Sequence, residues 1–221
     1  VAVLPCGTRL LGFAADIGTT KVAMYLVDLE SGETLGALGA LNPQIACGED
    51  VISRLASDQT EGGARRLQQR IVACLGEGIV ELCGRSGVRP NQIVDAVVVG
   101  NTAMHHLFAG LPTRQLGVAP YVAAVSDPLA ISARDLGLPL ATDAEVHLPS
   151  NIAGFVGADH VAMLLAADFH LLHGTVLALD IGTNTEMSLL HGGRLVTCSC
   201  PSGPAFEGAH LTVGMRAAPG A

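Results

Sequence analysis

Two segments of the chain repeat one pattern of strands and turns. Residues 12–35 and 175–196 each contain an apolar run, the tetrapeptide Asp-Ile-Gly-Thr, a second apolar run, a glycine-containing turn and a third run. Apolar runs of this kind, bounded by turn residues, are typical of strands. Copies this far apart do not form a solenoid, whose units are about 20 to 50 residues long. The repeat therefore predicts two related halves, each opening with three strands.

The first Asp-Ile-Gly-Thr turn has the chemistry of a phosphate-binding loop. Gly18 lets the backbone approach an anion, and Thr19 and Thr20 offer hydroxyl and N–H donors. Asp16, at the end of a strand, can hold Mg²⁺ through water, and Lys21 adds a positive charge. A single turn of this type is equally compatible with an ordinary hairpin.

A second copy of the turn, in the sequence DIGTNTE at 180–186, favours phosphate binding over the hairpin alternative. We expect Gly182, Thr183 and Asn184 to donate hydrogen bonds to phosphate oxygens. Asp180 would be a second carboxylate that binds the metal or orients water. The two loops would close on the same phosphates from opposite halves.

A third element, GNT, follows the apolar run 93–99, which we interpret as a buried strand. Gly100 and Asn101 form a glycine turn, and we expect Thr102 to cap a helix that continues to residue 109. The N-terminus of a helix favours anions. This element is therefore a third candidate for the phosphate site.

The adjacent His105 and His106 lie in this helix. Because neighbouring residues point to different faces of a helix, the two cannot form a metal-binding pair, which needs a spacing of four. We expect packed core histidines rather than a catalytic base, and we assign no role to the other six histidines.

Composition excludes several classes of protein. Hydrophobic residues make up 49% and charged residues 14% of the 221 residues, which excludes intrinsic disorder. A formal charge of −8 with no tryptophan argues against a nucleic-acid partner. No apolar run approaches the ~18 residues of a membrane span, and no secretory signal precedes the cysteines, so we expect a cytoplasmic protein that does not enter a membrane.

The six cysteines show no metal-binding spacing, since no C-x-x-C pair occurs. Cys198 and Cys200 alternate along an expected strand and would share one face as buried, inert thiols. After them, the segment 198–210 has the outline of a loop leading into a helix, where Glu207 is either a ligand-facing carboxylate or, more simply, an exposed or capping residue.

Between the two halves, apolar residues at three- and four-residue spacing predict amphipathic helices over 49–55 and 64–82. The segment 111–149 has weak periodicity and predicts loops with short strands. The segment 154–168 predicts another helix, which leads the chain to the second half.

Six ordered blocks of sequence carry a resemblance to a known family. They are NPQIACGEDVISRL (42–55), VVVGNTAMHHLFAGLP (97–112), LGVAPY (116–121), LPSNIAGFVGAD (148–159), LALDIGTNTE (177–186) and SGPAFEGAHLTVGMRA (202–217). With the two DIGT loops and the GNT connection, they resemble the ATPase domain of the reductive activators of corrinoid proteins, in the actin, Hsp70 and sugar-kinase superfamily. The resemblance implies an α/β, actin-like fold built from ribonuclease-H-like βββαβα halves. It divides the chain into a linker (1–11), a first subdomain (12–173) and the incomplete start of a second (174–221).

The resemblance also implies a function. In that family ATP with Mg²⁺ drives electron transfer from a [2Fe–2S] domain, absent from this chain, to a Co(II) corrinoid protein, giving Co(I). The partners would be that corrinoid protein and a low-potential electron donor, and an exposed sheet edge could also support a homodimer. By position, Asp16 and Asp180 would be the catalytic and metal-binding carboxylates, and the three loops would bind the nucleotide. The family pattern has glycine where Thr185 stands.

Two other functions remain open from the residues. One is a small-molecule kinase of the same superfamily, which transfers the γ-phosphoryl group to a hydroxyl or carboxylate. The other is an actin-like assembly or chaperone module, in which the nucleotide controls polymerisation or peptide binding.

Overall fold

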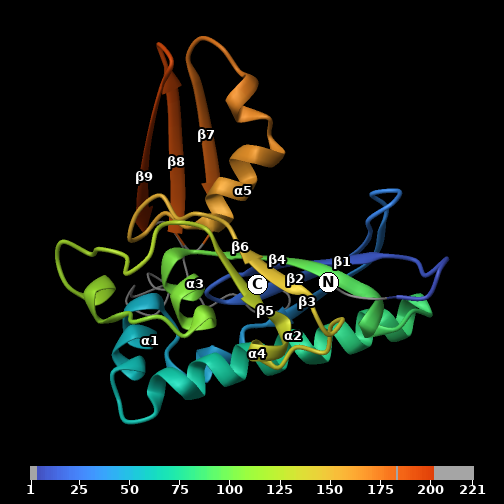
Figure 1. Cartoon of the computed structure of the whole chain (residues 1–221). Helices are drawn as coiled ribbons and strands as arrows, with labels where there is room; N and C mark the ends of the chain where they lie inside the picture. Colours follow the sequence, from blue (N-terminus) through green and yellow to red (C-terminus); the bar gives the residue numbers. More distant parts are fainter. Residues whose placement is uncertain (1–3, 183, 202–221) are drawn as a thin grey trace, which may run out of the picture. The chain divides into compact units, whose positions relative to one another are not determined.

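The computed structural model describes residues 4–182 and 184–201 (Figure 1). The chain divides into two compact units, Val1–Asp159 and His160–Ala221. Within the described residues, no helix is both long enough and apolar enough to cross a membrane.

The first unit is built on a six-stranded mixed sheet in the order β3-β2-β1-β4-β6-β5. Strands β1, β2 and β3 are antiparallel neighbours, β4 lies parallel to both β1 and β6, and β5 is antiparallel to β6. The strands are β1 (Leu11–Ile17), β2 (Lys21–Asp28), β3 (Thr34–Leu41), β4 (Ile93–Gly100), β5 (Leu129–Ser132) and β6 (Glu145–Leu148). The three strands predicted around the first Asp-Ile-Gly-Thr turn are therefore confirmed, as is the strand before GNT.

Helices cover one face of this sheet, and α2 runs along it (Figure 1). The helices are α1 (Val51–Asp58), α2 (Gly63–Ser86), α3 (Thr102–Ala109) and α4 (Ala133–Leu136), with short 3₁₀ turns at η1 (Pro43–Cys47), η2 (Pro90–Gln92) and η3 (Arg114–Gly117). Both predicted amphipathic helices are present, and the segment 111–149 consists of loops and short elements as expected.

The apolar stripe of α2 forms the centre of the core. Its members recur every three or four residues, and each is at most 1% exposed: Leu67, Ile71, Leu75, Ile79 and Leu82. They pack against the alternating buried residues of β1 and β2. Burial of one such side chain contributes about 1.5 to 3 kcal/mol, so this helix fixes the sheet whose edge carries the first loop.

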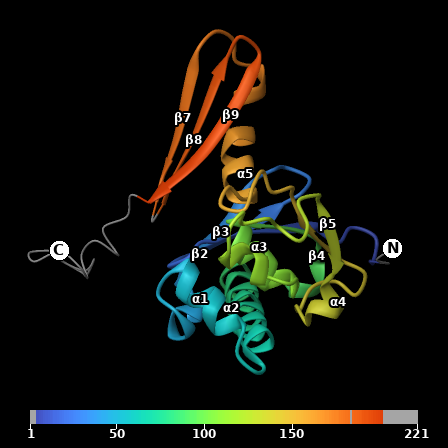
Figure 2. The same ribbon diagram turned by 90° about the vertical axis from the view of Figure 1, so that its left-hand side faces the viewer.

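The second unit is an antiparallel meander, β7-β8-β9, with α5 beside it (Figure 2). Its elements are α5 (Ala158–Ala166), which begins just before the unit, η4 (Phe169–Leu171), β7 (Val176–Ile181), β8 (Asn184–His191) and β9 (Arg194–Pro201). The repeat of three strands around an Asp-Ile-Gly-Thr turn is thus confirmed in both units.

The prediction that the helix before this unit starts at residue 154 is wrong. The backbone N–H groups of Ile152 and Ala153 both donate to the Val156 carbonyl oxygen, which makes a tight turn in place of a first helical turn. The helix therefore begins only at Ala158.

Candidate functional site

The first Asp-Ile-Gly-Thr turn joins β1 to β2. Asp16 is exposed near the end of β1, Gly18 to Thr20 form the bend, and Lys21 is the exposed first residue of β2. Gly18 is required here because a Cβ atom would lie 2.7 Å from the Lys21 carbonyl oxygen. A side chain at this position would therefore force the turn open.

Two buried side chains hold this turn from the core side. Asn42, 1% exposed, donates from Nδ2 to the Gly18 carbonyl oxygen at 2.8 Å, and its backbone N–H donates to the Thr20 carbonyl oxygen at 2.9 Å. Arg54, 0% exposed, donates from Nη2 to the Thr19 carbonyl oxygen at 2.8 Å. All three carbonyl groups of the bend therefore face hydrogen-bond donors of the protein.

The direction of these carbonyl groups fixes the direction of the amides. In a trans peptide the C=O and the following N–H point in opposite directions. The N–H groups of Thr19 and Thr20 are therefore turned away from Asn42 and Arg54, and neither donates a hydrogen bond within the described part of the chain. Two consecutive amides turned the same way form a concave anion site.

The GNT connection lies against this turn. Strands β1 and β4 are parallel, with Ile17 paired to Gly100, so their carboxyl ends meet at one edge of the sheet. A Cβ atom on Gly100 would lie 2.7 Å from the Ile17 carbonyl oxygen. Asn101 donates from Nδ2 to the Thr19 hydroxyl at 3.0 Å. The structure thus brings together two of the three predicted elements, although they are distant in the sequence.

The cap of α3 differs from the prediction. Asn101, not Thr102, is the N-cap, because its Oδ1 accepts the Met104 N–H at 3.1 Å. Thr102 is the first helical residue, is 0% exposed, and donates its hydroxyl to the Ala153 carbonyl oxygen at 2.5 Å. The Thr102 hydroxyl is therefore engaged within the fold.

Both histidines of α3 are packed in the core, as expected. His106 Nδ1 lies 2.7 Å from the Thr102 carbonyl oxygen, and its Nε2 accepts the Ala124 N–H at 3.1 Å. This pair of contacts selects the neutral ring with the proton on Nδ1. Burial, with the neighbouring ring, lowers the pKa of His105 to about 4, and burial also lowers the pKa of His106.

The second Asp-Ile-Gly-Thr turn joins β7 to β8. Asp180 pairs with Glu186 across the hairpin, and the Gly182 N–H donates to the Asn184 carbonyl oxygen at 2.9 Å. The Asp180 side chain is 40% exposed, so its carboxylate is accessible. The Gly182 N–H, which we expected to donate to a phosphate oxygen, is therefore engaged within the hairpin, and Thr183 lies outside the described residues.

A buried histidine lies behind Asp180. His160, on α5, is 0% exposed, and its Nε2 lies 2.7 Å from the Ser188 hydroxyl, which contacts the Thr197 hydroxyl at 2.9 Å. Its Nδ1 lies 3.9 Å from Asp180 Oδ2. Burial lowers the pKa of His160, while Asp180 opposes this shift. The aspartate of the second turn is therefore flanked by a hydrogen-bonded network.

Glu186 belongs to the same face of the hairpin, opposite Asp180. Its Oε1 accepts the Ser199 hydroxyl at 2.8 Å, and burial raises its pKa. The two carboxylates place negative charge on one side of the second turn, where a divalent cation would reduce their repulsion.

Three other expectations concern this half. Non-glycine residues with positive φ in the described ranges are Tyr121 and Asp168 only, so the extended backbone of Thr185 in β8 accommodates a β-branched side chain. Cys198 and Cys200 share a face of β9, but the first is exposed and the second half-buried, so the prediction of buried thiols is wrong. Glu207 lies outside the described residues.

The carboxylates fit Mg²⁺ only in an indirect role. Carboxylate oxygens are the hard ligands that Mg²⁺ prefers, and Asp16 is exposed at the end of its strand. Within the described ranges, however, no three His, Cys, Asp or Glu residues gather closely enough to hold a metal by themselves. An ion here would need phosphate oxygens and water as further ligands.

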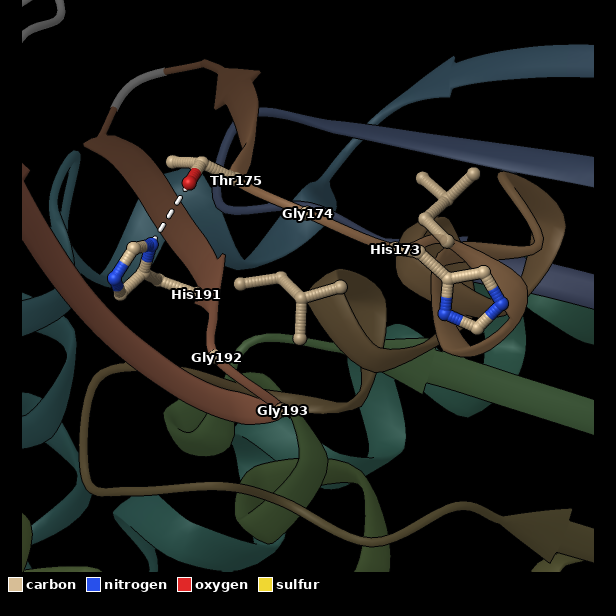
Figure 3. Close-up of a pocket in the computed structure, with 8 residues that line it drawn as sticks. His173, Gly174, Thr175, His191, Gly192 and Gly193 are labelled. Atoms are coloured by element: carbon tan, nitrogen blue, oxygen red, sulfur yellow. Dashed lines mark hydrogen bonds between the residues drawn. The ribbon is translucent and has the colours of Figure 1, made fainter.

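A pocket of about 210 Å³ occurs in the second unit (Figure 3). It lies at the opposite end of the hairpin, where Thr175 precedes β7 and His191 ends β8, and the Thr175 hydroxyl lies 2.7 Å from His191 Nδ1. The pocket contains none of the residues predicted to bind phosphate.

Asn42, Arg54, His160 and Glu186 were not predicted as site residues. Glu186 could have been found by pairing the two strands of the second hairpin about its short turn, which places it opposite Asp180. The other three carry no local signal, because each acts on a residue distant in the sequence.

A mixed sheet whose first two strands are joined by an Asp-Ile-Gly-Thr turn, with a second unit that repeats this strand-turn-strand pattern, defines an actin-like ATPase fold. A family model described as the C-terminal domain of RACo, the ASKHA domain, matches residues 174–221, and another, the RACo middle region, matches residues 11–172. The chain therefore belongs to the RACo family, the reductive activators of corrinoid proteins.

Relatives and a solved structure agree with this assignment. The chain is 37% identical over 214 residues to a corrinoid activation enzyme, RamQ, of Eubacterium limosum, covering 96% of this chain and 36% of that protein. It is 30% identical over 221 residues to the [Co(II) methylated amine-specific corrinoid protein] reductase of Methanosarcina barkeri, covering 96% and 40%. A solved reductive activator for a corrinoid, iron–sulfur protein superposes with a TM-score of 0.87 at 39% identity, covering 96% and 34%. The chain thus spans little more than a third of the length of these relatives.

Proposed function

We propose that this chain is the ATP-binding part of a protein that drives the one-electron reduction of a Co(II) corrinoid protein to Co(I). The electron would come from a low-potential donor through a [2Fe–2S] domain outside this chain, and the corrinoid protein would be the partner. The family assignment and the two relatives named for corrinoid activation and for Co(II) corrinoid protein reduction support this proposal.

The orientation of the first turn is the single observation that carries the nucleotide-binding part. Its carbonyl groups are bound by Asn42 and Arg54, and its amides of Thr19 and Thr20 are turned the other way. Gly18 allows the turn to stay tight, since a Cβ atom there would meet the Lys21 carbonyl oxygen, and Asn101 holds the Thr19 hydroxyl beside these amides. Such an arrangement binds an anion without a large excess of basic side chains.

The remaining residues take roles by their position in the loops. Asp16 and Asp180 would bind Mg²⁺ through water and orient the attacking water, and Lys21 would add positive charge near the phosphates. Gly100, Asn101 and Thr102 would form the connection. Thr183 and Asn184 would donate from the second half, while Gly182, whose N–H donates to the Asn184 carbonyl oxygen, would let the backbone approach the phosphates. We take the first subdomain to span 12–173 and the second to begin at 174. We also infer a cytoplasmic location, which the six free thiols support.

ATP would act by changing populations of conformations. ATP would stabilise the conformation of the protein that binds it more tightly. That change, rather than redox chemistry in this chain, would raise the effective reduction potential of the corrinoid by altering its coordination or docking.

The test uses the full-length protein. Co(II) corrinoid protein, a low-potential electron donor and the activator are mixed with and without Mg-ATP, and Co(I) is followed by visible absorbance. We expect Co(I) only with ATP, and we expect Asp16→Asn to abolish this dependence while the protein stays folded, because Asp16 is exposed.

Asp135→Asn is the matched control, since Asp135 is an exposed carboxylate on α4, where no site residue lies. Full ATP-dependent activation by the Asp16 variant would contradict the assigned role of Asp16. ATP-independent reduction by the wild type would contradict the proposed function.

A further inference from the structure

Arg54 is the largest fully buried side chain in the described part of the chain, and it lies directly beneath the first turn. All of its polar contacts are to uncharged groups. Nε and Nη2 donate to the Gly48 carbonyl oxygen at 3.2 and 3.0 Å, Nη2 also donates to the Thr19 carbonyl oxygen, and Nη1 lies 3.1 Å from the sulfur of Met104. Within the described ranges, no carboxylate lies within 4 Å of the guanidinium group.

The guanidinium group nevertheless keeps its charge. Burial lowers the pKa of Arg54 to about 10, and Asp50 partly opposes this shift. Arg54 is therefore protonated at neutral pH. A buried cation without a paired carboxylate is costly, since removing an ion from water costs several kcal/mol. Its presence under a loop whose Thr19 and Thr20 amides are turned away from it is explained if an anion binds on the other side of that loop.

The geometry shows how the charge reaches the anion. Arg54 and Asn42 approach the turn from the same side, because both contact the Met104 sulfur, at 3.1 and 3.8 Å. A hydrogen bond to a carbonyl oxygen polarises the peptide and strengthens the donor at its other end. The guanidinium bond to Thr19 C=O thus both orients and polarises the Thr20 N–H.

We propose that Arg54, with Asn42, is a positioning residue for the nucleotide phosphates: together they hold the carbonyl groups of the first turn so that its amides bind the anion. We call this pair the carbonyl clamp. This inference rests on the proposed function, and it adds residues that act through the loop without touching the ligand. The clamp raises affinity for the phosphates and takes no part in the transfer of electrons.

Two substitutions separate positioning from simple stability. Arg54→Lys keeps the charge but has one ammonium group, which cannot donate to the Gly48 and Thr19 carbonyl oxygens with the fixed geometry of guanidinium. Asn42→Asp keeps the Oδ1 that accepts the Gln44 N–H at 2.9 Å but replaces the donor to Gly18 by a carboxylate oxygen. Arg70→Lys is the control, since Arg70 is an exposed residue of α2.

The experiment measures Mg-ATP binding to the full-length protein by isothermal titration calorimetry, together with KM for ATP and kcat in the corrinoid reduction assay. We expect each clamp variant to bind Mg-ATP at least tenfold more weakly, about 1.4 kcal/mol, with KM raised and kcat at saturating ATP within twofold of wild type. Arg70→Lys should match wild type. If one clamp variant fails to fold, its kcat and the cooperativity of its unfolding fall instead. The binding measured for the other clamp variant then decides whether the clamp positions the turn.

The outcomes separate the two proposals. If the wild type binds Mg-ATP and a folded clamp variant binds it with the same affinity, the clamp is overturned and the proposed function stays intact. Absence of Mg-ATP binding by wild type overturns the proposed function and the clamp with it. A fall in kcat of the clamp variants without a change in their KM for ATP overturns the positioning role.

Discussion

Gly157→Ala is predicted to disturb the connection between β4 and α3, because Gly157 packs directly against that connection. A Cβ atom at Gly157 would lie 2.4 Å from both the Asn101 Cα and the Gly100 carbonyl oxygen. Ordinary contacts of a Cβ atom are longer by about 1 Å. Because both opposing atoms belong to the backbone, no side-chain rotation can relieve the contact, and the connection has to move.

The expected cost follows from overpacking of a closely packed region. Inserting one methyl group where the neighbours cannot yield costs about 1 to 3 kcal/mol, and rigid backbone on the opposing side favours the upper end. For a unit of this size, 1 kcal/mol lowers the melting temperature by about 2 to 4 °C. A cost near 3 kcal/mol therefore predicts a fall of about 6 to 12 °C. Since Asn101 holds the Thr19 hydroxyl, Mg-ATP affinity should fall as well.

Differential scanning calorimetry of the full-length protein, with calorimetric titration of Mg-ATP, measures both effects. Gly84→Ala is the matched control, because Gly84 lies in α2 with nothing within 4 Å of an added Cβ. Alanine is a better helix former than glycine, so this variant should be about 0.5 to 1 kcal/mol more stable. Unchanged melting temperature and unchanged Mg-ATP affinity in Gly157→Ala would refute the argument from backbone contact.

Two further predictions concern the core of the first unit. Acidification should destabilise it, because the pKa of His105 is about 4 when folded and 6.5 when unfolded, so the unfolded chain binds a proton first as the pH falls below 6.5. From His105 alone, the free energy of unfolding should be about 2 kcal/mol lower at pH 5 than at pH 7.5. Urea titrations at both pH values test this. If the pH dependence is as steep in His105→Gln as in wild type, His105 is not its source. Leu75→Ala should cost about 2 to 5 kcal/mol, because Leu75 is 0% exposed in the core, whereas Leu165→Ala, at a side chain 66% exposed, should change stability by less than about 0.5 kcal/mol. Equal unfolding midpoints for these two leucine variants would count against the packing described here.

Sequence periodicity predicted the elements whose patterns are local. The two hairpins around Asp16 and Asp180 follow from apolar runs on either side of a glycine turn, and α2 follows from its apolar stripe. The start of α5 could not be placed, because the backbone bonds from Ile152 and Ala153 to Val156 leave no local signature. Residues before Ala158 that are compatible with a helix form a tight turn instead.

The cap of α3 shows how tertiary contacts decide between equal local choices. Asn101 and Thr102 are both good N-cap residues, and propensity cannot separate them. The Ala153 carbonyl oxygen accepts the buried Thr102 hydroxyl, while the side chain of Asn101 satisfies both the Met104 N–H and the Thr19 hydroxyl. Each residue thus takes the position in which its polar group finds a partner from elsewhere in the fold.

The candidate site of the first unit depends more on backbone positions than on the chemistry of its side chains. Gly100 packs against the Ile17 carbonyl oxygen and Gly157 against Gly100, so three segments far apart in sequence approach with no room for a Cβ atom. The polar side chains that complete the site, Asn42 and Arg54, bind carbonyl oxygens of the turn and leave its amides for a ligand. An anion bound there would be recognised chiefly by peptide groups. Removal of one ligand-facing hydroxyl should therefore weaken binding less than a change that rotates a peptide of the turn.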